Sequence, residues 1–158
     1  TQPRIWDADA LNLLAKQGAR VHSADIATPH PGEAARLLAV TPEDVQRDRF
    51  AALHALQEKL GCTVVLKGAG TVVKALSERP AIISAGNPGM GVGGMGDVLT
   101  GCIAALVAQG MSAPKAAIAG ALLHAAAGDA AVMEEGERGL LPTDLLPWLR
   151  KLANPYRR

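Results

Sequence analysis

The chain has 158 residues, of which 49% are hydrophobic and 20% are charged, and this composition supplies a buried core and excludes intrinsic disorder. The length fits one domain, so we assign residues 1–158 to a single domain. The net charge is +1 and only four residues are aromatic, which argues against a nucleic-acid partner because such proteins use basic surfaces and aromatic stacking.

The sequence also carries no sign of a membrane or of an oxidising compartment. The most apolar stretch, 113–133, is interrupted by Lys115, His124 and Asp129, which is costly in a bilayer and ordinary in a packed helix. We interpret His124 and Asp129 as helix residues without a chemical role. Residues 1–7 have neither a basic leader nor an apolar signal core, and the two cysteines stand apart without CxxC spacing, as expected of buried thiols. We therefore predict a cytoplasmic protein that does not contact membranes.

The first part of the chain alternates short strands with helices. The pattern predicts a strand ending at 4–6, a helix over 10–17 closed by Gly18, a strand over 24–28 and a helix over 33–38. A longer helix is predicted over 41–60, because Thr41 and Pro42 form a capped helix start and Gly61 provides a stop.

The remainder of the chain continues this alternation. We predict strands over 63–66, 71–73 and 81–84, and helices over 97–109, over 114–133 and from Pro142 to Asn154. The glycine turn at 67–70 joins two of these strands as an antiparallel pair. The whole pattern predicts an α/β fold with helices on a mainly parallel sheet. The strands are few for a sheet of ordinary size, which predicts that an N-terminal part of the domain is absent.

A glycine-rich loop precedes the predicted helix at 97–109. Six of the twelve residues from Gly86 to Asp97 are glycine, so the backbone can adopt positive φ angles and a ligand can approach it closely. The helix that follows directs its free N–H groups and the positive end of its dipole toward that ligand. The loop therefore predicts an anion site, most simply for a phosphate.

Three types of phosphate loop contain glycine-rich segments of this kind. A Walker A loop is excluded because Asp97 follows Gly96, where that motif requires lysine. The segment 91–96 matches GxGxxG, but no acidic residue follows at the distance at which a dinucleotide fold binds the ribose. The third type places a carboxylate at the helix start, where it could deprotonate a hydroxyl that attacks the bound phosphate. The alternative interpretation of Asp97 is a plain N-cap.

Four segments together resemble one family. Gly86–Gly101 resembles the anion-hole motif of ribokinase-like proteins, in the form carried by the ADP-dependent NAD(P)H-hydrate dehydratases. Asp7–Asn12, Thr28–Glu33 and Leu66–Thr71 resemble the remaining signatures of that family, in the family's order. The resemblance implies a ribokinase-like three-layer α/β/α fold over nearly the whole chain. It also implies that the N-terminal part of the family's longer domain is absent, and with it one wall of the site.

The resemblance assigns site residues by position. Asp97 would be the catalytic base and would also contact the substrate. The anion hole would comprise Gly93, Gly94, Met95 and Gly96, and the nucleotide would be bound by Lys67, Gly68, Ala69, Gly70, Thr71 and Gly96. Turn chemistry alone leaves another interpretation of 67–70 open, namely a hairpin with a solvated lysine.

Two further residues follow from the segment Thr28–Glu33. By resemblance, His30 would contact the hydrated nicotinamide, and its neighbouring prolines would hold it with little entropy cost. The alternative is a surface histidine in a proline turn. Glu33 matches a glutamate that organises magnesium in ribokinase-like sugar kinases, although a glutamate in the first turn of a helix is also favourable for the dipole.

The implied reaction is the repair of hydrated NADH or NADPH, with ADP as co-substrate by resemblance. Mg²⁺ is implied by phosphoryl-transfer chemistry. The alternatives are a ribokinase-like kinase of a vitamin or sugar alcohol and a nucleotide-binding module without activity. The exposed sheet edge predicts association into a homo-oligomer, and some family members carry a fused epimerase domain.

Overall fold

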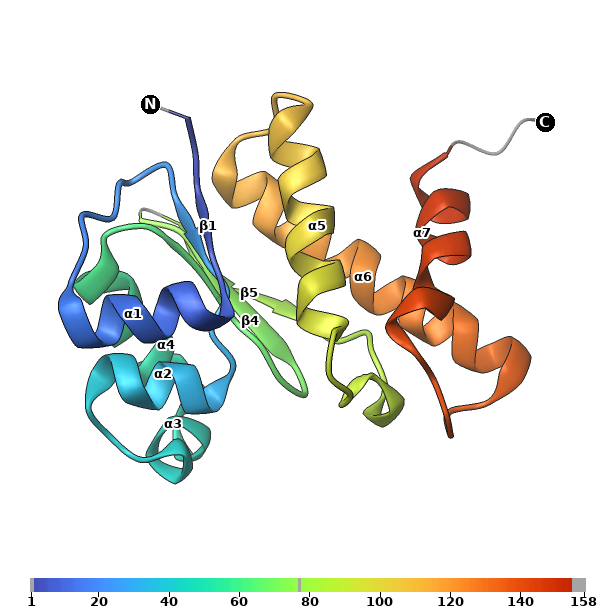
Figure 1. Cartoon of the computed structure of the whole chain (residues 1–158), viewed down its shortest axis with the longest axis horizontal. Coiled ribbons are helices and arrows are strands. Elements are labelled where there is room, and N and C mark those ends of the chain that lie inside the picture. Colours follow the sequence, from blue (N-terminus) through green and yellow to red (C-terminus); the bar gives the residue numbers. More distant parts are fainter. Residues whose placement is uncertain (1, 77, 155–158) are drawn as a thin grey trace.

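The computed structural model describes residues 2–76 and 78–154, and it contains a five-stranded sheet with helices on both faces (Figure 1). The strands are β1 (Ile5–Trp6), β2 (Ile26–Ala27), β3 (Thr63–Leu66), β4 (Thr71–Lys74) and β5 (Ala81–Ile83), and they lie side by side in chain order. The ribokinase-like α/β prediction therefore agrees with the observed sheet-and-helix layers.

The sheet is mixed, which corrects the prediction of a mainly parallel one. The pairs β1–β2 and β2–β3 are parallel, whereas β3–β4 and β4–β5 are antiparallel. The antiparallel pair at the turn 67–70 was predicted, but the second was not. Residues 75–80 are too few for the crossover that a parallel β4–β5 pair would require, so these strands must run in opposite directions.

Helices form the two outer layers. They are α1 (Ala8–Gln17), α2 (Pro31–Leu38), α3 (Pro42–Arg47), α4 (Arg49–Leu60), α5 (Met95–Ala108), α6 (Ala113–Glu135) and α7 (Leu145–Ala153), with 3₁₀ turns η1 (Pro88–Met90) and η2 (Pro142–Asp144). One hydrophobic cluster joins α1, α2 and α4 to one face of the sheet, and a second joins α5 and α6 to the other. A third, smaller cluster holds α7 against α6 (Figure 1).

The single helix predicted over 41–60 is wrong, because the chain breaks at Asp48. This residue has φ −142° and ψ 86°, and its carboxylate accepts a hydrogen bond from the Ala51 N–H at 2.9 Å. Aspartate has a low propensity for the interior of a helix but is a preferred N-cap residue. It therefore ends α3 and begins α4. The predicted ends are correct: Thr41 caps α3, and Gly61 ends α4 in the left-handed region.

Helix α6 is long and apolar enough, by length and composition alone, to cross a membrane. Half of its most apolar window is buried within the protein, and the helix contacts β2 to β5, α5 and α7. These contacts agree with the packed helix predicted for this stretch. Both cysteines are free; Cys62 is buried, as predicted, whereas Cys102 is only half-buried.

Candidate active site

A cavity of about 560 Å³ opens where α2, the β3–β4 turn, the glycine loop and the start of α5 meet. Ten of the predicted site residues line it: His30, Glu33, Lys67, Gly68, Thr71, Gly93, Gly94, Met95, Gly96 and Asp97. Ala69 and Gly70 belong to the same turn but do not line the cavity. The structure thus brings residues from distant segments to one place, while their individual roles stay predictions.

The glycine loop ends in a helix start that differs from the predicted one. Gly94 is the N-cap of α5, with φ +91°, and the helix begins at Met95 rather than at Asp97. Asp97 is therefore the third helical residue, and the interpretation of it as a plain N-cap is wrong. The N–H groups of Gly96 and Asp97 lie in the first turn, where a helix provides no internal acceptors for them. Asp97 is exposed on the cavity wall.

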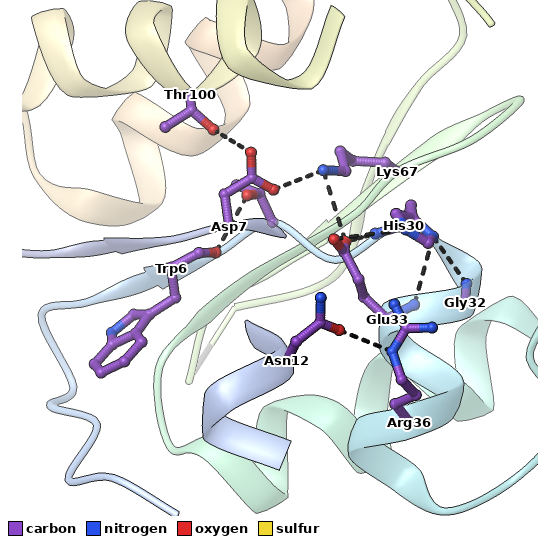
Figure 2. Close-up of polar contacts among 10 residues, drawn as sticks. Trp6, Asp7, Asn12, His30, Gly32, Glu33, Arg36, Lys67 and Thr100 are labelled. Atoms are coloured by element: carbon purple, nitrogen blue, oxygen red, sulfur yellow. Dashed lines mark hydrogen bonds and ion pairs between the residues drawn. The ribbon is translucent and has the colours of Figure 1, made fainter. Parts of the chain in front are cut away.

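Lys67 is not a solvated lysine. Its Nζ donates a hydrogen bond to Asp7 Oδ1 at 2.7 Å and lies 3.8 Å from Glu33 Oε2, and its side chain is only 18% exposed (Figure 2). A Cβ atom on Gly96 would lie 3.3 Å from Nζ. The ammonium is therefore held beside the first turn of α5, and the glycine leaves room for it there.

Asp7 lines the cavity, although the sequence analysis gave it no role of its own beyond its place in the family signature Asp7–Asn12. It follows β1, and its second carboxylate oxygen accepts a hydrogen bond from Thr100 Oγ1 at 2.9 Å (Figure 2). Burial would raise the pKa of Asp7, but the contacts with Lys67 and Thr100 outweigh burial and lower it. The available signal was its position after a parallel strand, because ligands of α/β folds bind at the carboxyl ends of such strands.

His30 caps α2 and forms part of a capping box. Its Nδ1 accepts hydrogen bonds from the N–H groups of Gly32 at 3.0 Å and Glu33 at 3.4 Å, while Glu33 Oε2 accepts from the His30 N–H at 2.8 Å (Figure 2). The imidazole is 49% exposed and lines the cavity. Because Nδ1 accepts, the proton of the neutral ring is on Nε2. The proline turn therefore holds this ring in one orientation.

His124 was predicted to have no chemical role, yet it lines the cavity. Only 8% of it is exposed, and Nε2 has no hydrogen-bond partner within the described part of the chain. Burial lowers the pKa of His124 to about 4; the Met95 carbonyl opposes this shift and the charge of Lys67 adds to it. The sequence signal was that His124 is the only polar side chain within 116–128.

Asp129 was also predicted to be a plain helix residue, but it holds the glycine loop. Its two carboxylate oxygens accept hydrogen bonds from the Gly86 N–H at 2.9 Å and from Asn87 Nδ2 at 3.0 Å. Gly128, the residue before Asp129, also packs against the loop, since a Cβ atom at this position would lie 2.5 Å from Met90 Sδ. Helix α6 therefore positions the loop that lines the cavity.

Comparison with known proteins identifies the family. The sequence matches the Carb_kinase family, described as NAD(P)H-hydrate dehydratase, over residues 1–151. The chain belongs to this family. It is 54% identical over 153 residues to the bifunctional NAD(P)H-hydrate repair enzyme Nnr of Coxiella burnetii, covering 97% of this chain and 31% of that protein. It is 43% identical to the ADP-dependent (S)-NAD(P)H-hydrate dehydratase of Neisseria meningitidis serogroup B, covering 97% of this chain and 54% of that protein.

Solved structures confirm the ribokinase-like fold of this NAD(P)H-hydrate dehydratase family member. The ADP/ATP-dependent NAD(P)H-hydrate dehydratase of Bacillus subtilis, co-crystallised with ATP/Mg²⁺, superimposes with a TM-score of 0.83 at 28% identity, over 96% of this chain and 54% of that one. A ribokinase-like superfamily protein of Enterococcus faecalis V583 gives 0.78 at 33% identity, over 96% of this chain and 53% of that one. The chain thus spans about a third to a half of the length of these relatives.

Proposed function

We propose that this chain carries the nucleotide-binding and catalytic part of an ADP-dependent dehydratase that returns (S)-NAD(P)H-hydrate to NAD(P)H, with release of phosphate and AMP. The observation that carries the proposal is the shared cavity of Asp97, in the first turn of α5, and the Lys67 turn. Relatives named as dehydratases and repair enzymes support the assignment.

The reaction first converts the ring hydroxyl into a better leaving group. Asp97 takes the hydroxyl proton, the oxygen attacks the terminal phosphorus of ADP, and the bond from that phosphorus to AMP breaks. The N–H groups from Gly93 to Gly96 would stabilise the phosphoryl group during transfer. The ring nitrogen then supplies electrons as phosphate leaves, and loss of a proton from the adjacent ring carbon re-forms the double bond.

The remaining cavity residues would bind the two substrates. The turn 67–71 would hold the AMP portion together with Gly96, and Lys67 would contribute positive charge. His30 would contact the hydrated ring, because its Nε2–H lies on an exposed imidazole that the capping box orients. In this proposal Asp97 touches both the hydroxyl and the anion hole.

The residues present fit a magnesium ion. Asp7 and Glu33 place carboxylates on the cavity wall, and Mg²⁺ is commonly bound by one or two carboxylates together with substrate phosphates. Within residues 2–76 and 78–154 no group of three acidic, histidine or cysteine side chains forms a cage for a metal ion. When bound, the ion would neutralise phosphate charge, with Glu33 as the residue that helps to hold it.

The test follows the return of reduced-nicotinamide absorbance from hydrated NADH with ADP and Mg²⁺. This chain and an N-terminally extended form are assayed side by side, each as wild type and as Asp97→Asn. We expect Asp97→Asn to lower kcat at least about 100-fold while ADP still binds, since it removes the base and leaves the turn intact. Asp9→Asn, an exposed residue of α1 outside the cavity, is the matched control.

Two results would redirect the assignment. A phosphorylated alcohol accumulating from small alcohols, without recovery of NADH, would identify a ribokinase-like kinase. ADP binding without turnover in either form would identify a nucleotide-binding module. Cytoplasmic location, homo-oligomer formation and a fused epimerase domain stay predictions.

A further inference from the structure

One arginine side chain binds the backbone of the turn that carries Lys67. Arg49, the first residue of α4, donates through Nη2 to three backbone carbonyls of this region: Leu66 at 3.0 Å, Lys67 at 3.3 Å and Gly70 at 3.3 Å. Its other terminal nitrogen, Nη1, donates to Gln46 Oε1 at 2.8 Å. The guanidinium is thus fixed on one side by α3 and on the other by the turn.

Arg49 and Gly68 fit closely together. Gly68 has φ +140°, and a Cβ atom built on it would lie 2.9 Å from Arg49 Nη1. The backbone conformation favours glycine here, and a side chain would in addition displace the guanidinium from its present position. Arg49 does not line the cavity, so it acts on the cavity through the turn.

The direction of the carbonyls matters for anion binding. A backbone turn attracts phosphate through its N–H groups, while carbonyl oxygens that faced the ligand would repel it. Arg49, which does not line the cavity, donates to all three carbonyls, so the three oxygens point toward its guanidinium. An unpaired carbonyl would otherwise leave the turn free to reverse its peptide units.

We propose that Arg49 is a positioning residue that holds the 67–70 turn in the conformation that binds the phosphates of a nucleoside diphosphate. The inference rests on the proposed function for the identity of the ligand. It adds a residue of α4, outside the cavity, to the set that determines nucleotide affinity.

Geometry and charge can be separated by substitution. A lysine at position 49 keeps the positive charge, but a single ammonium lacks the planar donor fork that reaches several carbonyls at once. Arg49→Lys therefore tests the geometry, and Arg49→Gln removes the charge as well. Arg47 offers a matched control, because it is 74% exposed and its ion pair is with Asp44, away from the turn.

The experiment measures ADP binding by calorimetry, in the presence of Mg²⁺, for wild type, Arg49→Lys, Arg49→Gln and Arg47→Lys, each in this chain and in an N-terminally extended form. Amide hydrogen exchange at residues 68–71 is measured on the same samples without nucleotide. We expect both Arg49 variants to bind ADP about tenfold more weakly and to exchange these amides faster. We expect Arg47→Lys to match wild type in both measurements.

Different failures are distinguishable. If wild type binds ADP and the folded Arg49 variants bind it equally well, Arg49 has only a structural role and the inference is overturned while the proposed function stands. Arg49 variants with a lower Tm that still bind ADP with wild-type affinity at temperatures below unfolding would likewise overturn the inference. If wild type binds no ADP in either form, the nucleotide site itself is refuted, and this inference with it.

Discussion

His124 lines the cavity and carries a cost to the stability of the fold. An unpaired polar atom in a protein interior loses its hydrogen bonds to water without replacement, which destabilises the folded state by about 1–3 kcal/mol. The Nε2 atom of His124 is in this position, within the cavity wall and without a partner among the residues described. A purely structural position on this alanine-rich helix would be filled better by an apolar side chain.

The lowered pKa of His124 predicts a specific pH dependence of stability. The folded protein holds this histidine with a pKa of about 4, against 6.5 for an ordinary histidine. Between these values the unfolded chain binds the proton and the folded chain does not, so stability falls as the pH decreases through 6.5 toward 4. We expect wild type to lose about 1–2 kcal/mol more than His124→Phe between pH 7 and pH 5, measured by urea unfolding.

Two comparisons support or refute this interpretation. His54→Gln changes an exposed histidine on α4, and we expect it to follow the wild-type pH dependence. Equal losses of stability in wild type and His124→Phe would show that His124 takes up its proton in the folded state. The interpretation of His124 as a buried, neutral histidine would then be wrong.

At the level of elements, α5 and α6 pack closely through a glycine. A Cβ atom on Gly120 of α6 would lie 2.7 Å from Ile103 Cγ1 and 3.2 Å from Ile103 Cα, and Ile103 is fully buried. The second of these atoms belongs to the backbone, which cannot move without shifting the helix. The close approach of α5 and α6 therefore depends on the absence of a side chain at Gly120.

This packing predicts opposite effects for two similar substitutions. Gly120→Ala should destabilise the protein by about 1–3 kcal/mol through overpacking, despite the better helix propensity of alanine. Gly101→Ala, on the exposed side of α5 with open space around it, should stabilise the protein by about 0.5–1 kcal/mol. Thermal unfolding of both variants checks the pair. A stabilising Gly120→Ala would show that the two helices can separate at little cost.

Local signals predicted most of the elements but not all of their limits, since α1 and α2 also begin two residues earlier than predicted. The β-branched runs of β3 and β4 and the stop at Gly61 are properties of short segments, so the sequence shows them directly. The break at Asp48 depends on a hydrogen bond from the Ala51 N–H to its carboxylate. The composition of the segment does not show whether Asp48 caps a new helix or lies within a continuous one. The start of α5 was missed by two residues because Gly94 caps it with backbone geometry rather than with a side chain.

At the level of the whole molecule, the site is assembled from contacts between distant parts of the sequence. Asp7 meets Lys67 and Thr100, which are 60 and 93 positions further along the chain. The glycine loop was predicted as an anion site from its own residues, whereas the Lys67 turn was assigned to the nucleotide through the family resemblance. His124 and Asp129 were interpreted as plain helix residues, and Asp7 entered only as part of a family signature, because the contacts of all three depend on which strand or loop the fold places beside them.

The assembled cavity has an electrostatic property that no single segment shows. Its lining includes the carboxylates of Asp7, Glu33 and Asp97 and the ammonium of Lys67, so three negative charges and one positive charge leave a net charge of −2 with neutral histidines. ADP is also an anion. In the proposed function, a cation that accompanies the nucleotide would offset the repulsion between these charges.

Removal of Mg²⁺ with EDTA should therefore weaken ADP binding by at least about tenfold. Glu33→Gln should reduce this difference, because it removes one carboxylate charge while glutamine can still complete the capping box of α2. Asp44→Asn alters the equivalent capping box of α3, outside the cavity, and should leave the Mg²⁺ dependence unchanged. Calorimetric titration of ADP with Mg²⁺ or EDTA gives both affinities for each variant. If Glu33→Gln retains the full Mg²⁺ dependence, Glu33 serves α2 as a cap alone, and the cation is held by other groups of the cavity.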